Sequence, residues 1–342
     1  MRRLLLGSLL AASWSVTDSA ALVNLASLSS VLDRYDCLLL DQFGVIHDGK
    51  NAYEGAVNAV SEAQRRGVKV CVISNSSRRR GDSVARLRSM GFGPVEDDPN
   101  PDGLPPISVV TSGELVFAGL QKNEAPPFND LGMRCFVFGN GEEDEQYVRE
   151  CGKVAAPINQ ADFVLARGLF SMLGAGPDML RQPAAPYSAE AEAEVLAQAL
   201  ERGLPLLVAN PDEVRPDGKD SPMPGQLARR YKELGASEVR LVGKPYALIY
   251  DECRRLLAEE GVIAEGARIA AVGDSLHHDV LGAALNGVDS VFICSGVHYE
   301  ELGVAQAAAE TPEPEKLEKL VEGFAAKHDG IRPTHTLKAF RL

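Results

Sequence analysis

Four short apolar runs of the chain each end in residues whose side chains could do chemistry. In chain order these residues are Asp41, then Ser74 and Asn75, then Lys244, and finally Asp274 with Asp279 five residues further on. A single Asp after such a run is more often a turn former or a helix cap than a functional group. The ordered set is much harder to obtain by chance, because it combines a nucleophile, hydrogen-bond donors, a cation and further carboxylates.

The two carboxylates that directly follow apolar runs are suited to phosphoryl chemistry. An Asp carboxylate can attack a phosphorus centre and form a covalent intermediate, which assigns Asp41 as the candidate nucleophile. Mg²⁺ favours one or two carboxylates together with oxygens of the substrate. Asp41 and Asp274 are therefore the candidate ligands of a magnesium ion.

The remaining polar residues of the set can hold a phosphate group. Ser74 and Asn75, with backbone N–H groups at the start of a helix, can donate to phosphate oxygens. Lys244 supplies a permanent positive charge that stabilises both the nucleophile and the transferring group. We expect Asp279 to orient Lys244 or a metal-bound water.

The elements that must position these residues follow from the apolar pattern. Short, continuous apolar runs are typical of strands in a parallel sheet that is covered on both faces. The predicted strands of this sheet are 37–40, 68–73, 107–110, 239–242, 269–272 and 290–294. Helical patterns separate them at 54–66, 78–90, 114–120 and 248–260. This alternation predicts a doubly wound, mostly parallel α/β core, whose strand ends are where ligands bind.

A second α/β unit is predicted between the second and third of the polar clusters. Strands at 135–138, 163–166 and 204–209 alternate with a helix at 190–202, and Pro126–Pro127 precedes them as a boundary. We therefore divide the chain into a leader or disordered extension (1–21), a first core part (22–127), an inserted domain (128–225) and a second core part with the tail (226–342).

Composition narrows the classes of partner. The 342 residues are 45% hydrophobic and 24% charged, which is typical of a soluble globular protein. The net charge of −13 disfavours nucleic acid and anionic membranes as partners, because both require clustered Lys and Arg. An anionic substrate stays compatible with this charge, since one Lys and a metal ion suffice to bind it.

Cysteine usage and the N-terminus bear on the compartment. The six cysteines show no C-x-x-C spacing, and four of them fall in apolar runs, so we expect buried free thiols in a reducing environment. Residues 1–21 have a basic start and an apolar centre too short to span a bilayer. A secretory signal, an organellar transit peptide and an ordinary extension all stay open. The thiols favour an intracellular location, either cytoplasmic or, with a transit peptide, in a mitochondrion or plastid.

The order of these motifs resembles that of the haloacid dehalogenase superfamily. The matching stretches are Asp-x-x-Gly-Val at 41–45, Ser-Asn-Ser-Ser at 74–77, Gly-Lys-Pro at 243–245 and Gly-Asp-x-x-x-x-Asp at 273–279. The inserted unit is similar in position and size to the C2-type cap of class IIA members, which include 4-nitrophenylphosphatase-like and NagD-like proteins. The resemblance covers residues 22–303.

The resemblance implies a Rossmann-like core with an inserted C2-type cap. It also implies Mg²⁺-dependent hydrolysis of a small phosphorylated metabolite (a sugar, nucleotide or cofactor phosphate) through an aspartyl-phosphate on Asp41. The metal ligands would be Asp41, Asp274 and the backbone carbonyl of Phe43, and homodimers through the cap are common in similar proteins. By the same comparison, His277 and His278 are expected on the helix surface rather than at a metal.

Phe43 departs from the phosphatases of this superfamily, in which a second Asp at this position is the general acid/base. Phenylalanine cannot protonate a leaving group, and such help is worth on the order of 10²- to 10⁴-fold in rate. Three interpretations follow. His47 or Asp48 could replace the missing acid/base, the substrate could carry a good leaving group such as an aryl or acyl phosphate, or the protein could bind a phosphorylated ligand as a sensor or scaffold. The chain is most similar to a class IIA subgroup with an aromatic residue here.

Overall fold

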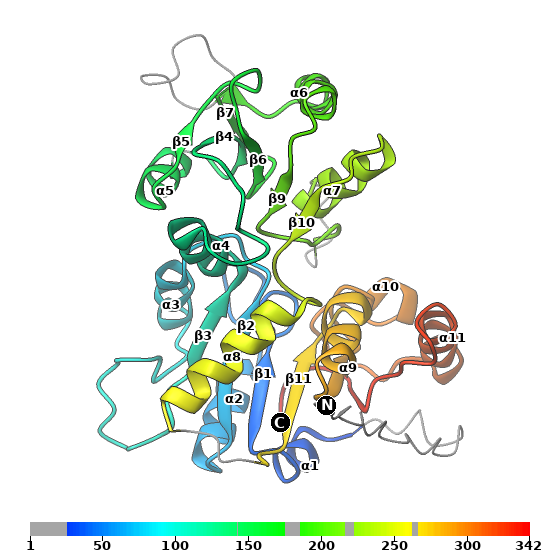
Figure 1. Ribbon diagram of the computed structural model, residues 1–342. Helices are drawn as coiled ribbons and strands as arrows, with labels where there is room; N and C mark the ends of the chain where they lie inside the picture. Colours follow the sequence, from blue (N-terminus) through cyan, green and yellow to red (C-terminus); the bar gives the residue numbers. More distant parts are fainter. Residues whose placement is uncertain (1–25, 142, 175–184, 216–221, 262–265) are drawn as a thin grey trace, which may run out of the picture.

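The protein contains two β-sheets, one above the other, each flanked by helices (Figure 1). The computed structural model describes residues 26–141, 143–174, 185–215, 222–261 and 266–342. The predicted leader, 1–21, lies outside these ranges. Within them, no helix is both long enough and apolar enough to cross a bilayer.

The lower sheet is the predicted parallel core, with strand order β13-β12-β11-β1-β2-β3. Its strands are β1 (Cys37–Leu40), β2 (Lys69–Ser74), β3 (Ser108–Thr111), β11 (Ile269–Gly273), β12 (Asp289–Ile293) and β13 (His335–Leu337). Leu38 of β1 pairs in register with Val70 on one side and Ala270 on the other. The edge strand β13 comes from the C-terminal tail and was not among the predicted strands.

Helices cover both faces of the core sheet, which explains why its strands are apolar on both sides. Leu38 and Leu40 pack with α1 (Leu28–Leu32), α2 (Ala56–Arg65) and α3 (Arg80–Ser89). Cys37 and Leu39 point to the opposite face and pack with α8 (Ala247–Glu259). The remaining elements of this part are a π-helical turn (Leu276–Val280), α9 (Leu281–Leu285), α10 (Tyr299–Leu302) and α11 (Pro314–Ala325).

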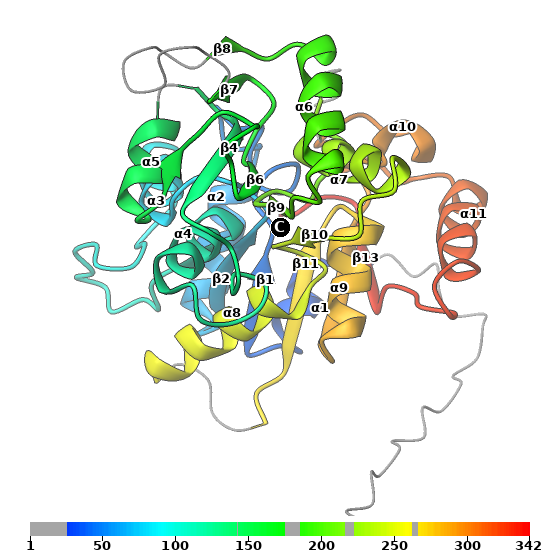
Figure 2. The same ribbon diagram turned by 45° about the horizontal axis from the view of Figure 1, so that its top comes forward.

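The upper sheet belongs to the inserted cap and has the strand order β10-β9-β6-β4-β7-β8, with β5 beside β4. Its strands are β4 (Arg134–Gly139), β5 (Val154–Ala155), β6 (Phe163–Ala166), β7 (Ser171–Leu173), β8 (Ala185–Pro186), β9 (Leu206–Val208) and β10 (Val239–Leu241). Viewed from above, α5 (Asp144–Glu150) lies on one side of these strands, and α6 (Ala189–Glu201) with α7 (Pro224–Glu233) on the other (Figure 2).

The position of β10 corrects the sequence prediction. We expected residues 239–242 to form a core strand and the cap to end at residue 225. Instead, β10 pairs in parallel with β9, and α7 packs against both strands. The hydroxyl of Tyr231 on α7 also donates to the carbonyl of Leu204. The cap sheet therefore continues to Leu241, and the chain re-enters the core only at the Gly-Lys-Pro motif.

Helix α4 (Ser112–Lys122) lies between the core and the cap (Figure 1). Its Leu115 packs against apolar clusters of both parts, and Tyr147 of α5 donates to the carbonyl of Gly113 at 2.8 Å. A Cβ at Gly113 would lie 2.2 Å from the backbone of Ser77, so only glycine permits this approach. The helix thereby fixes the cap directly above the loop that follows β2.

The predicted cysteine chemistry is confirmed. All six cysteines are buried free thiols, as expected from their apolar surroundings. Burial raises the pKa of several of them, including Cys294 to about 12, so these thiols are not poised to ionise.

Candidate active site

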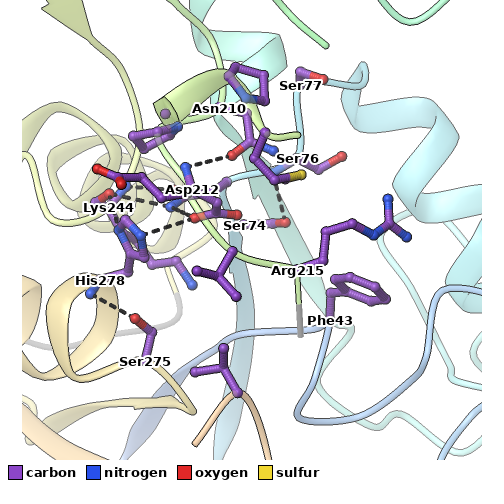
Figure 3. Close-up of a pocket in the computed structure, with 18 of the residues that line it drawn as sticks. Phe43, Ser74, Ser76, Ser77, Asn210, Asp212, Arg215, Lys244, Ser275 and His278 are labelled. Carbon is purple, nitrogen blue, oxygen red and sulfur yellow. Dashed lines mark hydrogen bonds and ion pairs between the residues drawn. The ribbon is translucent and has the colours of Figure 1, made fainter. Parts of the chain in front are cut away.

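The predicted site residues converge on one cavity of about 960 Å³ between the core and the cap. Asp41 follows β1, Ser74 ends β2 and Asp274 follows β11, so all three lie at the carboxyl edge of the core sheet. Lys244 lies in the segment between β10 and α8 and lines the same cavity (Figure 3). Parallel strand ends meet at one edge, which is why residues far apart in the sequence form a single site.

Lys244 bridges two carboxylates. Its Nζ lies 2.8 Å from Asp41 Oδ1 and 2.7 Å from Asp279 Oδ1, and all three side chains are buried or nearly so. Burial alone would lower the pKa of Lys244, but the two carboxylates outweigh it and hold that pKa well above its usual value. The lysine is therefore a permanent cation at the candidate nucleophile.

Three carboxylates gather at this point. Single oxygens of Asp41, Asp274 and Asp279 lie within 4.8 Å of one another. Burial raises the pKa of Asp41 to about 7, with Lys244 opposing the rise and the neighbouring carboxylates adding to it. Burial and Asp41 likewise raise the pKa of Asp274 well above its usual value. A buried cluster of this kind is short of positive charge, so these residues fit a hard divalent cation.

The three carboxylates differ in how their oxygens are used. Asp279 accepts from Lys244 with one oxygen and from the backbone N–H of Ser275 at 3.0 Å with the other. Asp274 accepts from the backbone N–H of Val297 at 2.8 Å through Oδ2. Both oxygens of Asp279 are thus engaged, which is compatible with the orienting role that stays a prediction, and Asp41 and Asp274 stay the candidate metal ligands. The carbonyl of Phe43 as a third ligand stays a prediction.

Ser74 and Asn75 have different roles from one another. Ser74 lies in the cavity beside Ser76, and its Oγ accepts from the backbone N–H of Ser76 at 3.1 Å (Figure 3). The amide of Asn75 instead accepts from the backbone N–H of Lys244 at 2.6 Å and donates to Asp212 at 2.8 Å. The side chain of Asn75 is thus occupied by Lys244 and Asp212, so a phosphate contact of Asn75, which stays a prediction, would come from its backbone N–H. The predicted helix start is corrected, because α3 begins only at Arg80. Glycine at position 243 permits the contact between Asn75 and Lys244, since a Cβ added there would lie only 2.4 Å from Asn75 Oδ1.

Two residues of the site were missed by the sequence prediction. His278 was expected on a helix surface, but its Nδ1 lies 3.1 Å from the carbonyl oxygen of Lys244. Its Nε2 lies 3.4 Å from Asp212 Oδ1 of the cap, which also accepts from Asn75 (Figure 3). Asp212 thus joins the cap to two core motifs. Asp212 follows Asn210 and Pro211, residues typical of a turn, and nothing in this segment indicates which partners it meets. His277 packs against Phe324 and His328 instead.

Phe43 occupies the position of the missing acid/base and is partly exposed to the cavity. Its ring centroid lies 5.8 Å from the guanidinium carbon of Arg215, a cap residue (Figure 3). The ring centroid of His47 lies 6.1 Å from that of Phe43. The side chain of Phe43 therefore faces the cap and presents an apolar surface there.

The surroundings of both predicted substitutes for this acid/base disfavour proton donation. His47 is only 2% exposed, and burial with the charge of Arg86 lowers its pKa to about 4. Asp48 accepts from the backbone N–H groups of Lys50 and Asn51, which hold its pKa below the usual range. At neutral pH both groups are therefore poor proton donors, and a substitute acid/base role for either residue stays a prediction.

Comparison with known proteins identifies the family. A model described as haloacid dehalogenase-like hydrolase matches residues 38–153, and a second, HAD-hydrolase-like model matches residues 241–320. Together the two matches span more than half of the chain and contain all four motifs. The chain belongs to the haloacid dehalogenase superfamily.

Similar proteins of this superfamily extend over most of the chain. Human chronophin is 27% identical over 83% of this chain and 89% of its own length. Glycerol-3-phosphate phosphatase from Gallus gallus is 29% identical over 78% of this chain and 82% of its own length. A haloacid dehalogenase-like hydrolase from Brucella suis 1330 is 26% identical, with a TM-score of 0.65 over 91% of this chain and 98% of that one.

More distant structures share the fold, including the cap. NagD from Escherichia coli K-12 has a TM-score of 0.57 at 17% identity, over 90% of this chain and 98% of its own. Glycerol phosphate phosphatase from Mycobacterium tuberculosis, solved in complex with magnesium, has a TM-score of 0.56 at 21% identity, over 91% and 77%. The haloacid dehalogenase core with a class IIA cap is thereby confirmed, whereas membership of a subgroup with an aromatic residue at position 43 stays a prediction.

Proposed function

We propose that this protein is a Mg²⁺-dependent phosphatase that hydrolyses a small phosphorylated metabolite through an aspartyl-phosphate on Asp41. The observation that carries the proposal is the position of the Lys244 ammonium group. It lies within hydrogen-bond distance of both Asp41 and Asp279, beside Asp274, in a cavity that is also lined by Ser74.

In the proposed reaction the chain supplies a nucleophile, a cation and hydrogen-bond donors. A carboxylate oxygen of Asp41 attacks phosphorus, the bond from phosphorus to the leaving oxygen breaks, and water later releases phosphate from Asp41. Lys244 keeps its charge throughout and stabilises the transferring group together with the Ser74 hydroxyl. Asp41, Asp274 and the Phe43 carbonyl would hold Mg²⁺, which supplies further charge for the phosphoryl oxygens.

The relatives support this reaction class. Three of the curated proteins that match most of this chain are named as phosphatases of glycerol phosphate. The solved structure with magnesium supports the metal for the same fold. We propose the substrate of this chain only as a phosphorylated small molecule. The cap residues that line the cavity include charged, polar and apolar side chains, and these do not favour one class of metabolite.

Phe43 favours a substrate with a good leaving group. Because neither His47 nor Asp48 is suited to donate a proton at neutral pH, an aryl or acyl phosphate, whose leaving oxygen needs little protonation, is the better substrate for this site. The apolar ring that faces the cap is compatible with an aromatic or otherwise apolar leaving group next to phosphorus.

The same residue supports one competing function. A protein that only binds a phosphorylated ligand needs no general acid/base. It would therefore tolerate an apolar side chain at this position. In that case Lys244 and Ser74 would bind the phosphate of the ligand, and this protein would act as a sensor or scaffold. Turnover separates the two possibilities.

The test is phosphate release from 4-nitrophenyl phosphate with Mg²⁺ or with a chelator, comparing the wild type with Asp41→Asn. The phosphatase predicts activity that disappears with the chelator and with the substitution. Wild-type activity no higher than that of Asp41→Asn would reject turnover and favour the ligand-binding alternative, which phosphorylated ligands that raise the melting temperature without being consumed would then support.

A further inference from the structure

A buried chain of hydrogen bonds runs from the turn after β1 to Ser74. The backbone N–H of Gly49 donates to His47 Nδ1 at 3.0 Å, and His47 Nε2 lies 3.3 Å from Gln42 Oε1. Gln42 Nε2 then donates to Ser74 Oγ at 2.7 Å. The side chains of His47, Gln42 and Ser74 belong to residues that are 2%, 4% and 4% exposed, so water does not compete for these bonds.

The direction of this chain is set at its origin. A backbone N–H can only donate, so Nδ1 of His47 must be the unprotonated nitrogen, and the ring proton lies on Nε2. That proton requires an acceptor, which fixes the amide of Gln42 with its oxygen toward His47. The NH₂ group of Gln42 consequently faces Ser74 and can act only as a donor to it.

Ser74 is left with one function. A hydroxyl group has two acceptor positions and one proton. Gln42 Nε2 and the backbone N–H of Ser76 fill the two acceptor positions. The Ser74 proton must therefore point elsewhere, and the residue lines the cavity that also contains Asp41 and Lys244.

We propose that Gln42 and His47 are positioning residues that hold the Ser74 hydroxyl as a donor toward a bound phosphate group. The inference rests on the proposed function of the same site and adds two residues to it. It also gives His47 a role in place of the acid/base function that we predicted: a neutral imidazole fixes Gln42. Burial and the nearby Arg86 keep the ring neutral, in agreement with this role.

The shape-conserving variant Gln42→Glu provides the test. A carboxylate at this position cannot donate to Ser74 and would instead accept its proton, turning the hydroxyl away from phosphate. The readout is the affinity for inorganic phosphate in the presence of Mg²⁺, measured by calorimetry, with KM and kcat for 4-nitrophenyl phosphate alongside. We expect Gln42→Glu to weaken phosphate binding by about 10- to 100-fold, as for the loss of a hydrogen bond to a charged group.

The double variant with Ser74→Ala separates this effect from simple charge repulsion. Without the hydroxyl, Gln42→Glu should cause little further loss of phosphate affinity. An undiminished loss in the Ser74→Ala background would show that the new charge acts directly on phosphate and would overturn the proposal. Wild-type phosphate affinity in Gln42→Glu would also overturn the proposal. It would show that Gln42 only fills space, because Glu has the same shape but cannot donate to Ser74.

A second variant covers the case in which Gln42→Glu does not fold. Gln42→Met keeps the volume but releases Ser74 to rotate, so phosphate affinity should fall only about 2- to 10-fold, and not at all when Ser74 is Ala. Unchanged affinity in Gln42→Met would contradict the proposal. Because phosphate binding is measured without turnover, normal binding in an inactive wild type would reject the phosphatase alone, whereas a wild type that binds no phosphate would reject both.

Discussion

The ammonium group of Lys244 lies 2.7 Å from Asp279 Oδ1, and both side chains are buried. The second oxygen of Asp279 accepts from the backbone N–H of Ser275, so this carboxylate is fixed at both ends. The contact directs the lysine toward Asp41, its other partner, at 2.8 Å. Asp279 thus holds Lys244 in the position where its ammonium group contacts Asp41.

Asp279→Asn should therefore impair catalysis without removing any group that touches the substrate. The amide keeps the shape but attracts the ammonium group less, so Lys244 loses its fixed orientation. We expect kcat/KM for 4-nitrophenyl phosphate to fall about 10- to 100-fold, as for other outer partners of a site. Asp251→Asn, an exposed Asp of α8 that pairs with Arg254, is the matched control and should leave the rate unchanged. Equal rates in both variants would contradict the positioning role.

Phe43→Asp should restore the missing acid/base. The side chain would point into the cavity toward the cap, where it can protonate an alkoxide that leaves. We expect the rate with alkyl phosphates to rise by about 10²-fold, and the rate with aryl phosphates to rise less, because their leaving groups need little protonation. Phe43→Leu controls for changes in volume. A rise of equal size in Phe43→Leu, or no rise in Phe43→Asp, would contradict this account of the departure.

The main features of the fold were predictable because they depend on local pattern. Continuous apolar runs such as Cys37–Leu40 predicted buried parallel strands, and their polar ends predicted the positions of Asp41, Lys244 and Asp274. The apolar run before Lys244 was equally clear, but its pattern could not show which sheet it joins. The pairing of β10 with β9 depends on tertiary contacts, including the packing of α7, which the local sequence pattern does not contain.

The finer geometry of the site could not be predicted for the same reason. Asn75, Asp212 and His278 are brought together only when the cap docks on the core, and each is an ordinary polar residue in its own segment. Gln42 gave no signal either, because its function depends on the orientation of its amide between His47 and Ser74. The sequence therefore predicted the reactive groups but not the residues that orient them.

Divalent cations should stabilise the protein at neutral pH. Three carboxylates within 4.8 Å, with the pKa of Asp41 raised to about 7, make the metal-free site unfavourable as those groups ionise. At a Mg²⁺ concentration 100 times the Kd, the free energy of unfolding should rise by about 2.7 kcal/mol. Thermal unfolding with and without Mg²⁺ measures this. The rise should be lost in Asp274→Asn and kept in Asp48→Asn; the opposite result would place the metal elsewhere.

His47 should make stability depend on pH. Its folded pKa of about 4 lies below the ordinary value of 6.5, so the unfolded chain binds the extra proton between these values. Stability from the neutral ring is therefore complete above pH 6.5 and is lost as the pH falls toward 4. The loss should amount to about 3 kcal/mol. Urea unfolding at pH 7 and pH 4.5 should show a smaller pH effect in His47→Gln than in the wild type, whereas equal effects would argue against a neutral, buried His47.

The central claim is a covalent phosphoryl group on Asp41, and trapping it is the most direct test. Because Phe43 cannot activate water, release of phosphate from Asp41 should be slower than its formation from an aryl phosphate. Protein mixed with 4-nitrophenyl phosphate and Mg²⁺, quenched in acid and digested, should then yield the Asp41 peptide with one added phosphoryl group, after a burst of 4-nitrophenolate. Turnover by the wild type without this adduct, or undiminished turnover by Asp41→Asn, would contradict the mechanism.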